Sequence, residues 1–365
     1  MNVPPNVSRL EPMPHEPERE APPDDDAAAA MGAYPRSWRP VDLAPVLDGT
    51  WQPPQPTVGR RADGVGLFYP GRTHTVVSET EGGKTWFALS ASLDELNAGK
   101  HVVYLDFEDD EGGTVGRLLT LGAHRDRIGD QFHYLRPDDP LGTGVNLDDL
   151  HRVLADHAPT LAVIDGVTEA MTMHGLNPLD NVDAATFGRM LPRRITEAGT
   201  AAANLDHVTK DRDGRGRYAL GAVHKLNGLG GASYLLDNRT PFGIGLTGRS
   251  TVRVAKDRPG QLRRRALPSG GSTWWFGDLV LASQSDTFAE VSVEPPVEHD
   301  ANFRPTVLME RIAKAIEQHG PLAARKIEAL VQGKAATIRQ AVTYLQLDGY
   351  LSEHTPHELL KPYSP

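Results

Sequence analysis

The stretch "THTVVSETEGGKTWFALSASLDELNAG", residues 73–99, decides the fold of this chain. An apolar run leads into two glycines, Lys84 and Thr85, and a helical pattern then continues to Gly99. A strand, a glycine-rich turn and a helix in this order are the context of a phosphate-binding loop. Backbone N–H groups at the helix N-terminus surround the phosphates, the lysine adds a positive charge, and the threonine hydroxyl is offered to Mg²⁺. We therefore predict an ATP site formed by Ser78, Glu79, Thr80, Glu81, Gly82, Gly83, Lys84 and Thr85.

This loop departs from the usual pattern at its start. Ser78 stands where Gly is usual, and Glu79 and Glu81 add negative charge. The backbone makes most phosphate contacts, so acidic side chains can point away from the ligand. Ser78 is expected to strain the first turn if its position requires a positive φ, which only Gly adopts freely. We expect Ser78 and Glu81 to affect affinity and turnover more than binding itself.

The chain from residue 37 to 285 alternates short apolar runs with helical stretches. The runs "HVVYLDFE" (101–108), "LAVIDG" (161–166) and "AAANLDHV" (201–208) are apolar on both faces, as buried parallel strands are. From about residue 232, the runs "ASYLLD", "STVRVAKD", "QLRRRAL" and "STWWFGD" follow without helices. The pattern predicts an α/β fold, a P-loop NTPase core whose parallel sheet has an antiparallel extension.

Composition excludes several classes of protein. The 365 residues are 39% hydrophobic and 24% charged, which is ordinary for a soluble globular protein. No apolar run approaches the roughly 18 residues needed to span a bilayer, so we expect no membrane partner. The chain has no cysteine, which excludes disulfides, cysteine zinc sites and a thiol nucleophile, and which suits the cytoplasm. The net charge of −10 means that any nucleic-acid contact has to be local.

Three further segments lie outside the core. Residues 1–36 are acidic and rich in proline, which is typical of a disordered tail. Residues 286–302 are acidic and contain prolines, and we predict a linker. Residues 303–365 contain three helical stretches and a short hairpin pattern, the order of a small winged helix-turn-helix domain.

Acidic residues follow two of the predicted strands, at the edge of the sheet where ligands bind. Asp165 ends an apolar run and is the predicted Mg²⁺ partner together with Thr85. Glu108 follows the strand at 101–106 and is the predicted base that polarises the attacking water. Asp106 and Asp109 are rivals for that role.

The set "EGGKTW", "YLDFED", "VIDGVTEAM" and "LDHVTKD", in that order, resembles the RecA-like ATPases of the RepA and DnaB type. The nearest resemblance is to RepA-like AAA ATPases of actinobacteria and their phages and mobile elements, over about residues 40–285. The resemblance implies a RecA-like fold, with Glu108 as catalytic base and His207 as sensor of the γ-phosphate.

The resemblance further implies a ring, a hexamer, in which ATP lies between neighbouring subunits. "VRVAKDRPG" resembles the DnaB-type finger strand, in which cationic side chains of one subunit reach the ATP of the next. Lys256 and Arg258 are two residues apart and so share one face of a strand. We expect a monomer to hydrolyse ATP poorly. The alternative to a finger strand is that Lys256 and Arg258 simply belong to an exposed basic strand end.

Two regions are candidates for DNA contact. The segment after His207 is long and glycine-rich, which suits single-stranded DNA, although a solvated surface loop would have the same composition. Its basic residues are Lys210, Arg212, Arg215, Arg217 and Lys225.

The second region is the third helix of the C-terminal segment. Ile338, Val342 and Leu345 form a buried stripe, which leaves Thr337, Arg339, Gln340 and Thr343 facing outward, as in a helix that reads a major groove. Residues 303–365 hold eight basic and six acidic side chains, a weak excess for duplex DNA. A protein partner remains an equal alternative.

Three functions fit these patterns. The first is a ring-forming, ATP-driven DNA motor, a replicative helicase or translocase. The second is a recombinase or recombination mediator on the same ATPase core. The third is an ATP-gated DNA-binding regulator.

Overall fold

The computed structural model describes residues 40–207, 228–243, 245–269, 273–296 and 305–363. The chain divides into two compact units, residues 1–53 and 54–365. The described part of the first unit contains one short helix, α2 (Ala44–Leu47), which buries none of its side chains. Within the described residues, none of the helices combines the length and the apolar character that a membrane crossing requires.

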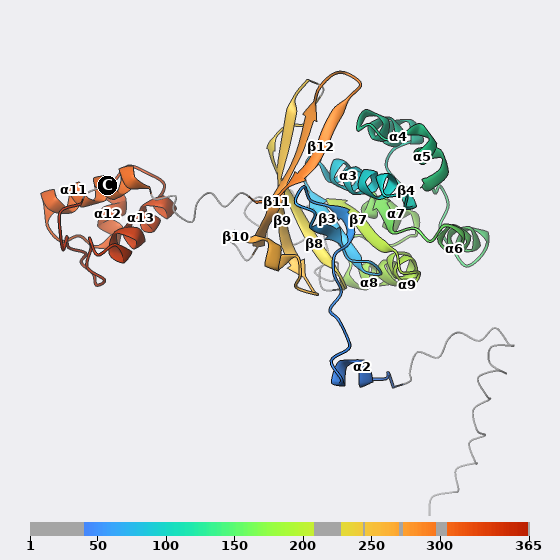
Figure 1. Ribbon diagram of the computed structural model, residues 1–365, viewed down its shortest axis with the longest axis horizontal. Helices are drawn as coiled ribbons and strands as arrows, with labels where there is room; N and C mark the ends of the chain where they lie inside the picture. Colours follow the sequence, from blue (N-terminus) through green and yellow to red (C-terminus); the bar gives the residue numbers. More distant parts are fainter. Residues whose placement is uncertain (1–39, 208–227, 244, 270–272, 297–304, 364–365) are drawn as a thin grey trace, which may run out of the picture. The chain divides into compact units, whose positions relative to one another are not determined.

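The second unit is built on a ten-stranded sheet with the order β10-β11-β9-β8-β3-β7-β6-β4-β5, and β12 pairs with β11 (Figure 1). Six strands from β8 to β5 run parallel, and the strands beyond β8 are antiparallel. This confirms the predicted α/β class, a RecA-like core with an antiparallel extension. The strands are β3 (Thr73–Ser78), β4 (Val102–Asp106), β5 (Phe132–Leu135), β6 (Leu161–Asp165), β7 (Ala201–His207), β8 (Ala232–Thr240), β9 (Thr247–Asp257), β10 (Leu267–Ser269), β11 (Thr273–Ser283) and β12 (Ala289–Glu294).

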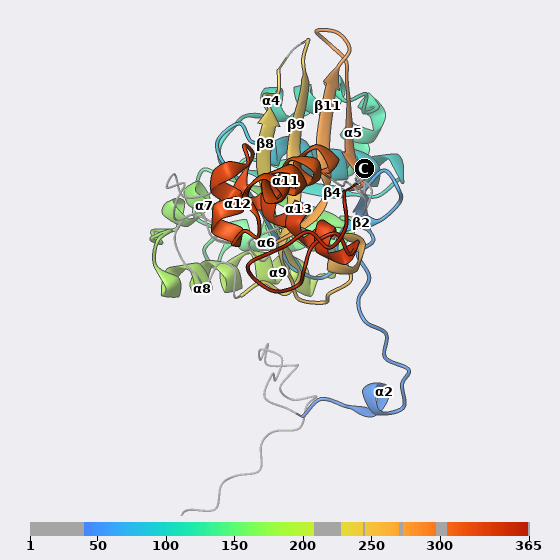
Figure 2. The same cartoon turned by 90° about the vertical axis from the view of Figure 1, so that its left-hand side faces the viewer.

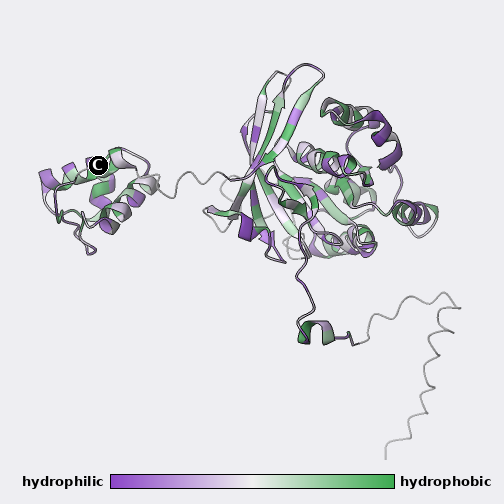
Figure 3. Ribbon diagram, viewed as in Figure 1, coloured by the Kyte–Doolittle hydropathy of each residue, from purple (hydrophilic) through white to green (hydrophobic). Residues whose placement is uncertain are grey.

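Helices cover both faces of the parallel strands, and the antiparallel strands extend the sheet away from them (Figures 1 and 2). On one face Phe87 and Leu89 of α3 pack against Val76 and Tyr104 in the larger hydrophobic cluster. The other face is packed by helices α6 to α9 in a second cluster. Figure 3 shows the resulting concentration of hydrophobic residues in the central strands. The helices are α3 (Lys84–Asn97), α4 (Glu111–Thr120), α5 (Arg125–Gln131), α6 (Val145–His157), α7 (Val167–Met173), α8 (Asn181–Met190) and α9 (Pro192–Glu197).

Strand β8 marks the change from parallel to antiparallel pairing. It pairs parallel with β3 on one side and antiparallel with β9 on the other. Our prediction placed "ASYLLD" wholly in the antiparallel extension, and the structure corrects it. A short antiparallel pair that we did not predict, β1 (Val58–Arg60) and β2 (Gly66–Phe68), precedes the first sheet strand.

Two other predicted boundaries differ in the structure. The predicted linker from residue 286 contains β12, which pairs with β11 over six positions from Ser283↔Ala289 to Asp278↔Glu294. Its acidic residues suggested a linker, but the alternation of Val291 and Val293 with polar residues suits a half-buried strand. The run at 261–267 was predicted as a strand and instead forms a 3-10 turn, η1 (Arg263–Arg265), before β10.

The C-terminal segment contains three helices, α11 (Thr306–His319), α12 (Ala324–Leu330) and α13 (Ala335–Leu347). They enclose a hydrophobic cluster of their own, in which Ile338 and Leu345 are buried as predicted. Two isolated antiparallel bridges, Leu322↔His357 and Leu351↔Leu359, stand where the hairpin was predicted. The winged helix assignment stays a prediction.

Candidate nucleotide site

The phosphate-binding loop runs from the end of β3 to the start of α3. Gly82 N–H donates to the carbonyl of Glu79 (3.0 Å), and the Ser78 hydroxyl donates to the same carbonyl (2.6 Å). The hydroxyl of Ser250 on β9 donates to the carbonyl of Gly82 (2.9 Å). Gly83 caps α3 with a φ of 94°. The loop is therefore held by its own turn and by a neighbouring strand, and it presents the N-terminus of α3 to a ligand.

The strain predicted for Ser78 falls on another residue. Ser78 is buried as the last residue of β3, paired with His207 and Leu236, and its φ is not positive. The positive φ of 60° belongs to Glu81. The condition for strain at Ser78 is therefore not met, because the chain turns only after the strand has ended. Ser78 instead restricts its neighbour, since a Cβ at Gly82 would lie 2.6 Å from the Cβ of Ser78.

Asp165 and Thr85 lie together, as predicted for a Mg²⁺ site. The Thr85 hydroxyl is 3.3 Å from Asp165 Oδ2, which also accepts from the Tyr104 hydroxyl. Asp165 Oδ1 is buried and has no hydrogen-bond partner within the described part of the chain. Burial raises the pKa of Asp165, so a nearby cation would stabilise its charged form. An unsatisfied carboxylate oxygen beside a hydroxyl fits the oxygen ligands that Mg²⁺ prefers.

Glu108 lies beyond the end of β4, at the same sheet edge. Its Oε1 is 3.5 Å from Nε2 of His207. Burial, followed by the charges of Asp165 and Glu169, raises the pKa of Glu108 to about 7. A carboxylate whose pKa is near neutral pH is suited to accept a proton from water.

The two rivals of Glu108 are occupied with other tasks. Asp106 accepts hydrogen bonds from the backbone of Glu108 and Asp109 and from the hydroxyls of Thr114 and Tyr134. It therefore shapes the turn that carries Glu108. Asp109 forms an ion pair with Arg117, with 2.8 Å between the charged atoms. Sequence reasoning left these three acids open, and the geometry favours Glu108.

His207, the last residue of β7, connects Lys84 to Glu108. Its Nδ1 is 3.0 Å from Nζ of Lys84, and its Nε2 faces Glu108. Burial and the charge of Lys84 lower the pKa of His207, which keeps the ring neutral. We infer that Nδ1 accepts a hydrogen bond from the lysine ammonium and that Nε2 carries the N–H that faces Glu108. The lysine, the histidine and the glutamate form one polar chain across the site.

Glu169 is a member of this site that our sequence reasoning missed. It lies in the first turn of α7, and its negative charge contributes to the raised pKa of Glu108. The available signal was its position four residues after Asp165, on a helix that starts at the same sheet edge.

Lys256 and Arg258 do not approach the phosphate loop of their own chain. Lys256 is paired with Ser233, which pairs with Thr75, near the amino end of β3. The loop lies at the other end of that strand. Arg258 is exposed and follows β9 directly. Burial, then the charge of Arg258, lowers the pKa of Lys256.

The structure describes only some of the residues that we predicted to contact DNA. Lys210, Arg212, Arg215, Arg217 and Lys225 lie outside the described residues. On α13, Gln340 is exposed and Thr337 is half-buried. Arg339 is exposed but forms an ion pair with Glu328 of α12, with 2.9 Å between the charged atoms. This pair neutralises part of the positive charge that we expected to face a DNA major groove.

Comparison with known protein families gives one result for this region. Residues 39–213 match the family model described as an AAA domain, and the match includes the phosphate loop, Glu108, Asp165 and His207. Comparison with curated proteins gives no match. With the RecA-like fold, this match supports an AAA-type P-loop ATPase domain that binds and hydrolyses a nucleotide.

Proposed function

We propose that this chain is a ring-forming ATPase that moves along single-stranded DNA, a replicative helicase or translocase of the RepA-like type. The observation that carries the proposal is the position of His207. It contacts the phosphate-loop lysine, faces Glu108, and directly precedes the basic segment 208–227. A group that senses the γ-phosphate is thus covalently continuous with the residues proposed to hold DNA.

The proposed chemistry is hydrolysis of ATP by water. The backbone of the loop and Lys84 hold the phosphates, and Thr85 and Asp165 are the residues that would hold Mg²⁺. When bound, Mg²⁺ neutralises negative charge on the transferring phosphoryl group. Glu108 orients the attacking water and accepts its proton.

Binding of a triphosphate changes the polar chain of the site. Lys84 donates to phosphate oxygens in place of His207, because a charge-assisted hydrogen bond to phosphate is stronger. His207 is then released to contact the γ-phosphate, and Glu108 is released to contact water. In this proposal, loss of the hydrogen bond between Lys84 and His207 changes the position of His207. Because His207 directly precedes the basic segment, the bound nucleotide thereby affects that segment.

Two observations support assembly with neighbouring subunits. Lys256 and Arg258 are distant from the phosphate loop of their own chain, which suits a role on the ATP of the next subunit. In addition, the described residues 40–53 expose several large apolar side chains, which are better covered in an assembly. More than half of the surface of each of these is exposed: Val41, Leu43, Val46, Leu47 and Trp51.

The proposal is tested by ATP turnover with and without single-stranded DNA. We expect DNA to stimulate wild-type turnover, and a variant with Lys210, Arg212, Arg215, Arg217 and Lys225 changed to Gln to keep basal turnover without stimulation. A matched control changes Arg152 and Lys314, two exposed basic residues on helices, to Gln and should respond to DNA as the wild type does.

Forked DNA then separates the helicase from its alternatives. Stimulated turnover without strand displacement would exclude a helicase and leave a translocase or a recombinase. Slow turnover that DNA does not change, with sequence-specific duplex binding, would favour the ATP-gated regulator. Electron microscopy distinguishes closed rings from the open filaments of a recombinase.

Sites shared between subunits predict complementation. We expect Glu108→Gln and Arg258→Ala each to lose activity alone, because one removes the base and the other the neighbour's cation. A mixture of the two should recover part of the activity, since some interfaces then combine an intact Glu108 with an intact Arg258. A mixture no more active than the two separate variants would contradict a finger acting on the neighbour.

A further inference from the structure

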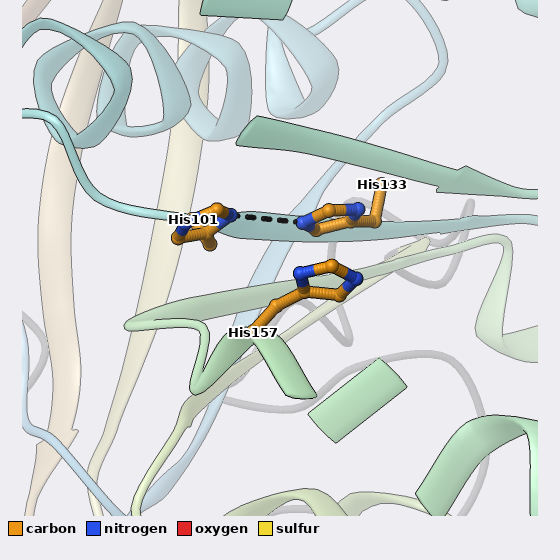
Figure 4. Close-up of side chains that lie close together, drawn as sticks. All are labelled: His101, His133 and His157. Carbon is orange, nitrogen blue, oxygen red and sulfur yellow. Dashed lines mark hydrogen bonds between the residues drawn. The ribbon is translucent and has the colours of Figure 1, made fainter. Parts of the chain in front are cut away.

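Three histidines lie close together in the structure (Figure 4). They lie near the amino ends of the parallel strands β4 and β5, at the end of the sheet opposite the phosphate loop. We propose that His101, His133 and His157 form a binding site for a divalent transition metal, with Zn²⁺ as the best match. The nucleotide site does not use them.

The fold explains why these side chains meet. His101 directly precedes β4, and His133 is the second residue of β5, which lies next to β4 in parallel register (Val102↔Phe132). His157 is the last residue of α6. The N–H of Thr160 donates to the carbonyl of His101 (3.0 Å), which ties the turn after α6 to the start of β4. Three elements thus bring one histidine each to the same place.

The nitrogen atoms are close enough to share one ion. Each ring offers one nitrogen, and the three nitrogens lie within 4.8 Å of one another. Nδ1 of His101 and Nε2 of His133 are hydrogen-bonded at 3.0 Å. Two nitrogens bound to one tetrahedral zinc, each at about 2.0–2.1 Å, are separated by roughly 3.3 Å. The pair is therefore already near the ligand spacing.

One adjustment is needed before all three rings bind. The rings of His133 and His157 are stacked, with centroids 3.8 Å apart and planes 19° apart. Their lone pairs do not converge in this arrangement, so one ring has to turn about χ2. That torsion is broad for histidine, and all three side chains are only half-buried.

The chemistry of the cluster selects the class of metal. Three imidazoles suit Zn²⁺, Co²⁺, Ni²⁺ or Cu²⁺ and discriminate against Mg²⁺ and Ca²⁺, which prefer oxygen. Strand β5 is the outermost parallel strand, and β4 is its neighbour in the sheet. An ion held by these histidines would therefore fasten β5 to β4 and to the end of α6.

The test uses the full chain without a histidine tag, after treatment with a chelator. Calorimetric titration with Zn²⁺ should give one site per chain, Co²⁺ should produce the visible absorption of a tetrahedral site, and Mg²⁺ should give neither. His157→Gln should weaken Zn²⁺ binding by at least ~10-fold, since one ligand of three is lost. The matched control His151→Gln, on the exposed face of the same helix, should bind Zn²⁺ as the wild type does.

A second measurement needs no variant and so does not depend on the variant folding. Diethylpyrocarbonate modifies accessible histidines, and mass spectrometry locates the modified residues. Zn²⁺ should protect His101, His133 and His157 while leaving His151 reactive. Absence of a stoichiometric Zn²⁺ site in the wild type, equal affinity in His157→Gln, or equal modification with and without Zn²⁺ would each overturn the proposal.

Discussion

Strand β4 joins two polar clusters of different chemistry. Before its first residue lies His101, beside two other imidazoles, and beyond its last residue lies Glu108, beside Asp165 and Lys84. The carboxyl edge offers oxygen atoms and an ammonium group, which suit a phosphate with its magnesium ion. The amino edge offers nitrogen atoms, which suit a transition metal. One strand therefore separates a predicted catalytic site from a proposed structural one.

Burial acts on both clusters, with opposite results for the two types of group. At the carboxyl edge it raises the pKa of Glu108 to about 7, and at the amino edge it lowers the pKa of His133 to about 4. In each case the low-dielectric surroundings favour the neutral form. The consequences differ: a carboxyl with a pKa near 7 takes up a proton from water readily once it is ionised, whereas an imidazole that stays neutral keeps a lone pair for a metal ion.

The largest expected effect comes from Lys84→Ala. Loss of its charge should lower ATP turnover by roughly 10³-fold, as for other groups that stabilise developing negative charge. Zn²⁺ affinity at the amino edge should not change, because the two clusters share no residue. Conversely, His157→Gln should leave ATP turnover unchanged. An ATPase assay and a Zn²⁺ titration on both variants check this, and loss of both properties in either variant would show that the edges are coupled.

Glu108→Gln should have the next largest effect. Turnover should fall by roughly 10²-fold, because the amide cannot accept a proton from water. ATP binding should be retained, since the loop and Lys84 are intact. Asp109→Asn is the matched control, and its turnover should stay near the wild-type value because Asp109 is paired with Arg117. A comparable loss in both variants would remove the distinction between Glu108 and its rival.

The pH dependence of stability follows from the same residue. The pKa of Glu108 is raised from 4.5 to about 7 in the folded chain. Its contribution to stability is therefore fully present below pH 4.5 and is lost as the pH rises through about 7. Between pH 6 and pH 8 the wild type should lose more thermal stability than Glu108→Gln. Asp109→Asn should follow the wild type. Its hydrogen bond with Arg117 lowers the pKa of Asp109, so this carboxyl is ionised in both the folded and the unfolded chain over this pH range. An equal change in melting temperature between pH 6 and pH 8 for the wild type and Glu108→Gln would contradict the raised pKa of Glu108.

The smallest expected effect compares one strained residue at each edge. Among the described residues that are not glycine, Glu81 in the phosphate loop and Ala158 after α6 have a positive φ, of 60° and 43°. Replacement by glycine removes a steric cost of about 1 kcal/mol at each position, less a part for the more flexible unfolded chain. Urea unfolding should therefore show a small gain for Glu81→Gly and for Ala158→Gly. ATP affinity should change only in Glu81→Gly, and a change in Ala158→Gly would break the separation of the two edges.

The features that could be predicted from the sequence are those that depend on residues close together in the chain. The phosphate loop, Asp165, Glu108 and His207 each follow a recognisable apolar run, and parallel strands bring such positions to one edge. The errors came from context. Ser78 still belongs to β3, and the positive φ falls three residues later, at Glu81. The acidic composition around β12 concealed its alternation of apolar and polar residues.

The amino edge could not be predicted in the same way. His101, His133 and His157 lie 32 and 24 residues apart, with no metal-binding spacing between them. Their meeting depends on which strand neighbours which, and on where α6 ends. Glu169 is intermediate, since its proximity to Asp165 in the chain was visible but its electrostatic effect on Glu108 was not.

The bond between Ser250 and the phosphate loop has a consequence for a ring. Ser250 lies on β9, and the same strand leads to Lys256 and Arg258, roughly 20–26 Å further along the chain at ~3.3 Å per residue. In the assembly that we propose, one stiff strand would join the nucleotide of one subunit to the cations that serve the next. A displacement of the phosphate loop would then be transmitted along the strand to these cations. ATP hydrolysis at adjacent sites would therefore follow one direction around the ring.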